Sequence, residues 1–281
     1  MARQLPAVDV DGMVAFLVEL LNIPSPTGDT ERAMSVIQEA FAELPLALEL
    51  AQKGYLSGTL PGASESAPRA LTAHADTLGA MVSRIKENGR LRLTQLGGWI
   101  WNSVEGEGVT IFASNGAQLR GTILPTMASI HAHTRDVSYT QRSEENMEVR
   151  IDAHTTSAKE TEELGIRVGD IVALDPRVEV SDTGYIRSRH LDDKAGVATI
   201  YGAVAALTAA GLQPAQRTTI HISNYEEVGH GAAAGFPPDL AELVTVDMAV
   251  VAPKQRSDER CVTICAKDSA GPYHMGLRRR L

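Results

Sequence analysis

The sequence predicts an α/β fold, in which a mixed-sheet, three-layer domain is interrupted by a β-rich insertion. Two amphipathic helical segments and a few short apolar strands occupy residues 1–80. Residues 81–186 change to short alternating runs with Asn-Gly turns, which are typical of antiparallel hairpins. Helical and strand patterns return after that. We therefore expect residues 1–80 and 187–281 to form one α/β domain around the insertion.

The order of the elements follows from local patterns. Apolar residues recur at helical spacing from Met13 to Leu21, and again after Asp29. The apolar run RALTA ends in His74, which places this histidine at the exit of a buried strand. After residue 187 the sequence predicts an alanine-rich helix closed by Gly211, and then the strands RTTIHIS, LVTVDMAVV and CVTICAK.

Composition excludes some classes of function. The formal net charge of the 281 residues is −9, and the only dense basic run is Arg278–Arg280, so we expect no nucleic-acid partner. No apolar stretch resembles a leader or is long enough to span a bilayer, so we expect no membrane partner. On a single strand Cys261 and Cys265 would lie beyond disulfide reach, which favours a reducing, cytoplasmic location.

Four short patterns could carry chemistry. In LTAHADTLGAMV, His74 and Asp76 share one face of an extended chain, so the carboxylate can orient the ring, although His-x-Asp is also common without function. In RHLDDKAG, Asp192 and Asp193 open a helix, where an ordinary N-cap and a first-turn acid would explain them equally well.

The other two patterns are acidic. Glu226 and Glu227 follow an apolar strand, and a solvated surface explains such a pair unless a metal or a shared proton offsets the repulsion. Asp247 interrupts the apolar run LVTVDMAVV, either as a strand end in solvent or as a buried ligand. Together the four patterns supply the imidazole, the carboxylates and the free base that a two-cation hydrolase needs.

These motifs resemble, in the same order, those of the metallopeptidase family that includes the TET-type and glutamyl or deblocking aminopeptidases. That family carries AH-x-D-x-x-G-x-x-V, Leu-Asp-Asp-Lys/Arg, Glu-Glu-Val-Gly and a later Val-Asp, which correspond to AHADTLGAMV, LDDK, EEVG and TVDMAVV in this sequence. Within the family, LRLTQLGGWIWNSVEGEG and SEENMEVRID look most like the peptidase encoded with the N-acetylglutaminylglutamine amide osmoprotectant system.

The resemblance implies hydrolysis of N-terminal residues from short peptides or a dipeptide-derived substrate, with two divalent ions, Zn or Co. It assigns His74, Asp192 and Asp247 to one metal, and Glu227 to a second metal bridged by Asp192. Glu226 becomes the general base, and Asp76 orients His74. It also implies a homo-oligomer, with an oligomerisation or lid role for the insertion.

The resemblance also raises an expectation about the second metal. Relatives continue past the segment GPY…LRRRL to a histidine that completes this site, so we expect the site to be incomplete in the printed sequence unless His274 substitutes. Two alternatives therefore stay open: a catalytically impaired relative that serves as a metal-binding assembly subunit, and an amidase or deacylase acting on an acetylated dipeptide.

Overall fold

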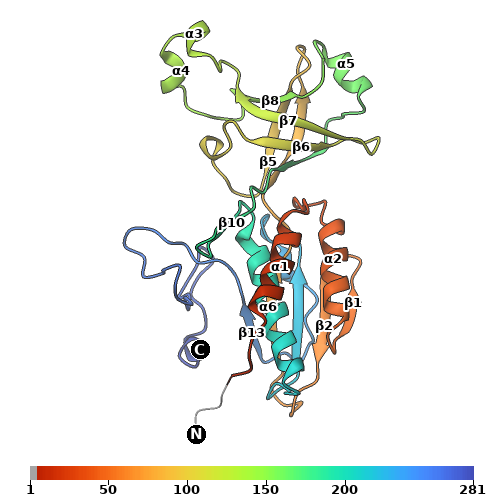
Figure 1. Ribbon diagram of the computed structural model, residues 1–281, viewed down its shortest axis with the longest axis vertical. Coiled ribbons are helices and arrows are strands. Elements are labelled where there is room, and N and C mark those ends of the chain that lie inside the picture. Colours follow the sequence, from red (N-terminus) through yellow and green to blue (C-terminus); the bar gives the residue numbers. More distant parts are fainter. Residues whose placement is uncertain (1–4) are drawn as a thin grey trace.

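The computed structural model describes residues 5–281, which form an α/β unit and a β-barrel placed one above the other (Figure 1). Helix α1 (Val10–Leu21) begins where the Asp9 carboxylate accepts a hydrogen bond from the Gly12 amide at 3.0 Å. Helix α2 (Glu31–Ala42) follows and buries Ile37 and Phe41. Both helices cover the sheet through apolar faces that the helical periodicity predicted.

The sheet of the α/β unit has five strands in the order β1-β2-β12-β3-β13. Their bounds are β1 Ala47–Leu50, β2 Leu56–Leu60, β3 Arg69–His74, β12 Thr218–Ser223 and β13 Glu242–Thr245. Strand β3 runs parallel to both β12 and β13, whereas β2 is antiparallel to β1 and β12. The carboxyl ends of β3, β12 and β13 therefore meet at one edge, where open α/β sheets bind their ligands.

Helix α6 (Leu191–Ala209) packs against α1 and β3 and closes a single apolar core. Its buried side chains include Val197, Ile200 and Val204. Among the residues shown in the structure, Lys194 is unusual, because it is fully buried and donates to the main-chain oxygens of Leu20 at 2.9 Å and Ile23 at 2.6 Å. The amine thus joins the start of α6 to the carboxyl end of α1.

The opposite face of the sheet buries a histidine. The His221 ring lies between the rings of Tyr55 and Phe236, with centroid distances of 4.9 and 4.5 Å. Its Nδ1 is 3.1 Å from the Thr72 hydroxyl and its Nε2 is 3.1 Å from the Ala234 carbonyl oxygen. Burial lowers the pKa of His221 to about 4, so the ring is neutral near pH 7.

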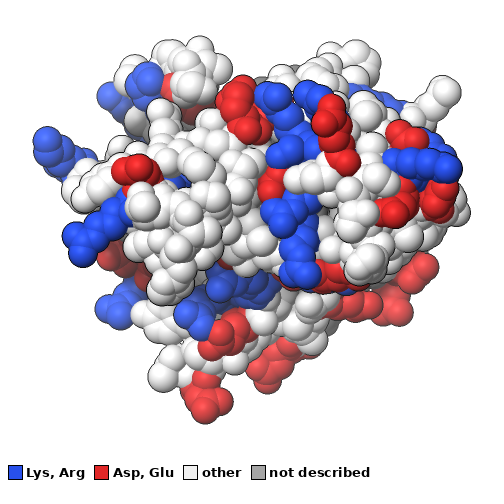
Figure 2. Space-filling model, turned by 90° about the horizontal axis from the view of Figure 1, so that it is seen from above, with Lys and Arg blue, Asp and Glu red and all other residues white. Residues whose placement is uncertain are grey.

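The insertion is a closed barrel with strand order β4-β5-β8-β7-β6-β9. Its strands are β4 Gly79–Ile85, β5 Leu91–Leu96, β6 Gly108–Phe112, β7 Gln118–Pro125, β8 Met147–Ile151 and β9 Ile171–Leu174. Short helices lie in the connections between these strands: η1 Trp101–Ser103, α3 Ile130–His133, α4 Asp136–Tyr139 and α5 Ala158–Glu163. Seen from above, basic and acidic side chains lie scattered among uncharged residues (Figure 2).

The barrel has a core of its own, separate from that of the α/β unit. Its wall also buries one acidic side chain, Glu148 of β8, which is 2% exposed and pairs with Lys86 and Arg90. The mixed α/β fold with a β-rich insertion, predicted from the pattern of apolar and turn residues, is thereby confirmed.

Both connections between the two units pass the same edge of the sheet. The chain leaves β3 at His74 and enters β4 at Gly79. It returns through the hairpin of β10 (Glu179–Val180) and β11 (Ile186–Arg187), and starts α6 at Leu191. The residues that surround the carboxyl ends of β3 and β12 therefore lie directly below the barrel (Figure 1).

The carboxyl-terminal part departs from the sequence-based prediction. Strand β13 ends at Thr245, so the predicted strand LVTVDMAVV is shorter than expected and Asp247 lies just beyond its end. The predicted strand CVTICAK is wrong, because residues 261–266 have no strand structure and Lys267 forms only an isolated bridge with Pro272. Valine and isoleucine favour strands, but a strand also needs a neighbour, and among the described residues this segment pairs only at its end, near Pro272. The last elements are η2 Gly231–Ala233 and α7 Met275–Arg278.

Candidate metal centre

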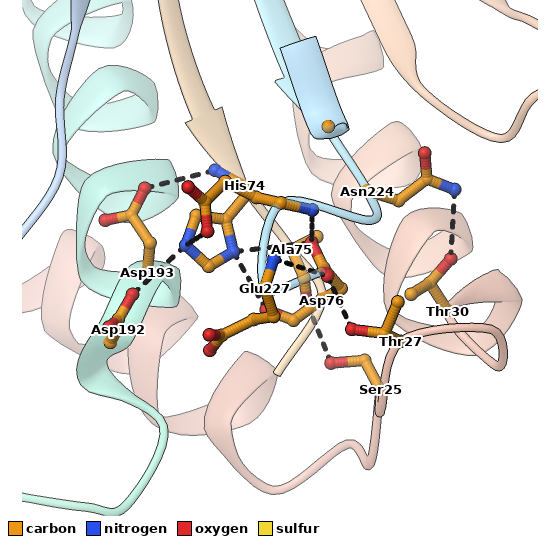
Figure 3. Close-up of polar contacts among 12 residues, drawn as sticks. Ser25, Thr27, Thr30, His74, Ala75, Asp76, Asp192, Asp193, Asn224 and Glu227 are labelled. Carbon is orange, nitrogen blue, oxygen red and sulfur yellow. Dashed lines mark hydrogen bonds and ion pairs between the residues drawn. The ribbon is translucent and has the colours of Figure 1, made fainter. Parts of the chain in front are cut away.

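His74 lies at the centre of a polar cluster at the edge of the sheet (Figure 3). Its side chain is 2% exposed. Nδ1 donates to the main-chain oxygen of Asp76 at 2.9 Å, and the nearest carboxylate oxygen of Asp76 is 3.4 Å away. A carbonyl can only accept, so this bond fixes the proton on Nδ1 and turns Nε2 toward Asp192 Oδ1 at 3.0 Å and Glu226 Oε2 at 3.6 Å.

The Asp76 carboxylate holds several segments together. It is 0% exposed and accepts hydrogen bonds from the Thr27 hydroxyl at 2.7 Å and from the amides of Glu226 and Glu227 at 3.1 and 3.3 Å. Burial works against ionisation, but the hydrogen bonds from His74 and Thr27 hold the pKa of Asp76 below its usual value. Asp76 thus fixes the two glutamates through their main chain, in addition to contacting His74.

The two aspartates at the start of α6 have different surroundings, although a single cis peptide bond joins them. The side chain of Asp192 is 32% exposed and faces His74. Asp193 is 1% exposed, and its two oxygens accept from the amides of His74 and Gly196, each at 3.1 Å. Burial, followed by the charge of Asp247, raises the pKa of Asp193 to about 8. Asp193 therefore fastens α6 to the end of β3.

Asp247 reaches the same cluster from the far side of β3. The Val246 amide donates to the Thr72 carbonyl at 2.8 Å, which continues the parallel pairing and brings Asp247 level with His74. One ligand atom each of His74, Asp193 and Asp247 lies within 4.8 Å of the other two. Partial burial raises the pKa of the Asp247 carboxyl. These three side chains are close enough to surround a single cation.

Glu226 and Glu227 extend from the loop that follows β12. Tyr225, with a φ of +64°, makes the sharp turn that aims the next two amides at Asp76. Glu226 is 47% exposed, and partial burial raises its pKa. Burial raises the pKa of Glu227 to about 7, and its Oε1 is buried without a hydrogen-bond partner among the described residues.

The electrostatics of the cluster call for positive charge. Burial alone would lower the pKa of His74, but the hydrogen bonds to Asp192 and Asp76 raise it to about 12. Crowded carboxyl groups, an imidazole nitrogen that faces two of them and the Glu227 Oε1, which has no hydrogen-bond partner among the described residues, make up a set of donors that suits divalent cations. A cation would offset the burial and the repulsion that raise the pKa values of these acids.

The structure brings all the residues singled out in the sequence to one place. Asp192 and Glu226 each contact His74, Glu227 adjoins them, and Asp247 approaches from the end of β13. Their individual roles stay predictions. His274 has another contact, because its Nδ1 accepts from the Leu277 amide at 3.1 Å and caps α7.

Sequence reasoning missed two contributors to the cluster. Asp193 was read only as the neighbour of Asp192, although two adjacent acids on one helix start could have signalled different partners for each. Thr27 belongs to no motif, and only the fold shows that it bonds to Asp76.

Known proteins match most of the chain. A profile of the M42 glutamyl aminopeptidase family matches residues 54–281. The protein YhfE of Bacillus subtilis (strain 168), provisionally named an aminopeptidase, is 44% identical over 266 residues, which are 95% of this chain and 77% of that protein. The glutamyl aminopeptidase of Lactococcus lactis subsp. cremoris (strain MG1363) is 28% identical over 182 residues, 63% of this chain and 50% of that enzyme. Two further curated relatives are covered over 61% and 54% of their length.

Solved structures share the fold. Aminopeptidase APDkam598 from the archaeon Desulfurococcus kamchatkensis superposes with a TM-score of 0.76 at 21% identity, over 89% of this chain and 66% of that one. The PhTET1-12s dodecamer superposes with a TM-score of 0.65 at 23% identity, over 77% of this chain and 61% of that one. In residues 5–281, no helix combines the length and apolar character needed to cross a membrane. From the profile match and the 44% identity, we conclude that the chain belongs to the M42 glutamyl aminopeptidase family.

Proposed function

We propose that this chain is a metal-dependent aminopeptidase that hydrolyses the N-terminal peptide bond of short peptides at the cluster around His74. M42 peptidases are metal-dependent peptide hydrolases. The observation that carries the proposal is the convergence of the carboxyl groups of Asp192 and Glu226 on Nε2 of His74, beside Glu227 Oε1, which has no hydrogen-bond partner among the described residues. Buried acids crowd in this way where a cation offsets their repulsion.

The proposed enzyme would use two divalent ions, Zn or Co. His74, Asp192 and Asp247 would hold one ion, and Asp192 and Glu227 would hold the second. When bound, such ions polarise the carbonyl of the scissile bond and make water easier to deprotonate. The separations of 3.0 Å from His74 Nε2 to Asp192 Oδ1 and 3.6 Å to Glu226 Oε2 leave space for ligand bonds of about 2 Å.

Glu226 is the proposed general base. Its carboxylate is half-exposed, so water and substrate can reach it, and partial burial raises its pKa toward the working pH, which improves proton transfer. It takes a proton from the attacking water and delivers it to the leaving amine. Asp76 holds the Glu226 amide and the main chain around His74, and so fixes the base relative to the ring.

The comparisons favour a substrate with a free amino terminus. Two relatives that are named for an activity are a glutamyl and a lysyl aminopeptidase. This supports an aminopeptidase over a deacylase. A link to osmoprotectant dipeptide metabolism rests on the resemblance of LRLTQLGGWIWNSVEGEG and SEENMEVRID to the peptidase of that system. Hydrolysis of a glutaminyl anilide tests this link.

The proposed enzyme is a cytoplasmic homo-oligomer that assembles through the barrel, residues 81–186. Solved relatives are described as a dodecamer and as a tetrahedron or a large octahedral shell. Cys261 and Cys265 are both exposed and free, as in a reducing compartment. Light scattering on the purified chain measures the assembly directly.

The test combines metal content with turnover. Purified protein is stripped with a chelator, loaded with zinc, cobalt or manganese, and assayed on aminoacyl anilides and their N-acetylated counterparts. Glu226→Gln should keep its metal and lose about 10²- to 10⁴-fold in kcat. The control Glu163→Gln, on the exposed surface of α5, should match the parent protein. No turnover by metal-loaded parent protein would contradict the proposal, and turnover of only the acetylated substrates would assign a deacylase.

A further inference from the structure

The glutamate loop, residues 224–230, carries Glu226 and Glu227 and joins β12 to η2. The middle of the loop is held by the contacts with Asp76 and by hydrogen bonds within the loop. The Gly229 amide donates to the Glu226 carbonyl at 2.7 Å, and the His230 amide donates to the Tyr225 carbonyl at 3.1 Å. These bonds shape the crown of the loop, but they do not anchor its two ends to the rest of the protein.

The entrance of the loop is anchored to the turn between β1 and β2. Asn224 is 2% exposed, and its Nδ2 donates to the main-chain oxygen of Lys53 at 3.0 Å. The turn is shaped to receive this amide, because a Cβ on Gly54 would lie 2.5 Å from Asn224 Nδ2. Gly54 also has a φ of +94°, which a residue with a side chain rarely adopts.

The exit of the loop is anchored to the same turn through a side chain. Lys53 Nζ donates to the carbonyl oxygens of His230 at 2.6 Å and Gly231 at 2.7 Å. It also lies 6.0 Å from the centroid of the Tyr225 ring, which stacks on the His230 ring at 5.1 Å. None of the acidic side chains in the described part of the chain pairs with Lys53, so its ammonium is committed to the loop.

We propose that Lys53 is a positioning residue that clasps both ends of the glutamate loop and so sets the place of Glu226 and Glu227 at the metal centre. Its carbonyl holds the entrance through Asn224, and its ammonium holds the exit at His230 and Gly231. The proposal rests on the proposed function for its effect on catalysis. The clasp itself is a property of the fold, and it can be measured without turnover.

The clasp matters because the loop is supported unevenly. Asp76 fixes only the two amides at the crown, and Tyr225 beside them has a left-handed backbone, which is unfavourable for a residue other than glycine. When the exit is released, the turn can relax and carry the Glu226 carboxylate away from His74. A displacement of about 1 Å in a catalytic group can cost roughly 10²-fold in rate.

The experiment compares Lys53→Met, which keeps the length of the side chain and removes its donors, with Lys53→Arg, which can still donate to both carbonyls. Lys159→Met is the matched control, because Lys159 is 85% exposed on α5 of the barrel. Two readouts are taken: hydrogen exchange of the 224–231 peptide in metal-free protein, and kcat and KM of the metal-loaded enzyme on an aminoacyl anilide.

We expect Lys53→Met to speed exchange in this peptide and leave exchange in β3 and β12 as in the control, and to lower kcat by about 10- to 100-fold with KM unchanged. Lys53→Arg should recover most of both losses. Exchange and kcat equal to those of Lys159→Met would overturn the proposal, and so would equal losses in the arginine and methionine variants. If the parent protein shows no turnover, the proposed function fails. The exchange measurement still tests whether Lys53 holds the glutamate loop in place.

Discussion

Replacing Asp76 by asparagine tests how the cluster is built. The carboxylate accepts from the Thr27 hydroxyl and from the amides of Glu226 and Glu227, and it is fully buried. Asparagine has the same shape, but it offers one acceptor oxygen and turns an NH₂ group toward one of these donors. One buried amide then lacks a partner, at a cost of about 1–3 kcal/mol, and the charge assistance to the remaining bonds is lost. We expect the free energy of unfolding to fall by about 3 kcal/mol.

The same variant separates two roles of Asp76. The Nδ1 proton of His74 is held by the main-chain carbonyl of Asp76, which the substitution keeps, so zinc affinity of the His74 nitrogen should change little. The glutamate loop should loosen instead, with kcat lower by about 10²-fold.

Urea unfolding, metal titration and steady-state kinetics measure these three effects, with Asp182→Asn in the exposed turn between β10 and β11 as the control. An unfolding free energy equal to that of the control would refute the reasoning. Loss of metal affinity without a fall in kcat would refute it as well.

Three further predictions concern other parts of the molecule. The folded pKa of His221, about 4, lies below the unfolded value of 6.5, so its contribution of about 3 kcal/mol is complete above pH 6.5 and lost as pH falls toward 4. His221→Gln should therefore flatten the dependence of unfolding free energy on pH across that window, and an unchanged slope would contradict this. Gly97→Ala would place a Cβ 2.4 Å from Leu78 Cδ2 at a φ of +78° and should cost about 1–3 kcal/mol, whereas a Cβ at Gly98 meets no atom within 4 Å. Thermal melts of the two alanine variants make the comparison, and equal losses would count against it. Glu148→Gln should destabilise the barrel by about 1–3 kcal/mol in urea, because the neutral amide weakens the hydrogen bonds with two partly exposed cations, and no measurable loss would argue that solvent screens the pair.

The sequence predicted most of the site because its acids stand where strands end. His74 follows an apolar run, and Glu226 follows another, so a parallel pairing of the two strands was enough to bring them together. The run LVTVDMAVV left open whether Asp247 ends a strand, and the strand ends earlier, at Thr245, since local propensity does not tell where pairing stops.

Contacts between distant segments could not be predicted. Thr27 and Lys53 act through hydrogen bonds to residues far away in the chain, and no local pattern marks them. The burial of Lys194 is a similar case, because the carbonyl oxygens that accept its hydrogen bonds belong to α1 and the loop after it. Periodicity identifies faces and ends of elements, whereas partners of this kind depend on how the elements pack.

The strand order has a consequence for how the protein is made. Strand β3 lies between β12 and β13, and β2 also pairs with β12. Strands β2 and β3 can therefore complete their pairing only after the whole barrel has been synthesised. Until then the nascent chain holds only the β1–β2 pair of this sheet, with the apolar edge of β3 uncovered. Such an edge invites association with other chains. The barrel, whose strands are contiguous in the sequence, can close first and keep the unfinished sheet attached to a folded body while its last two strands emerge.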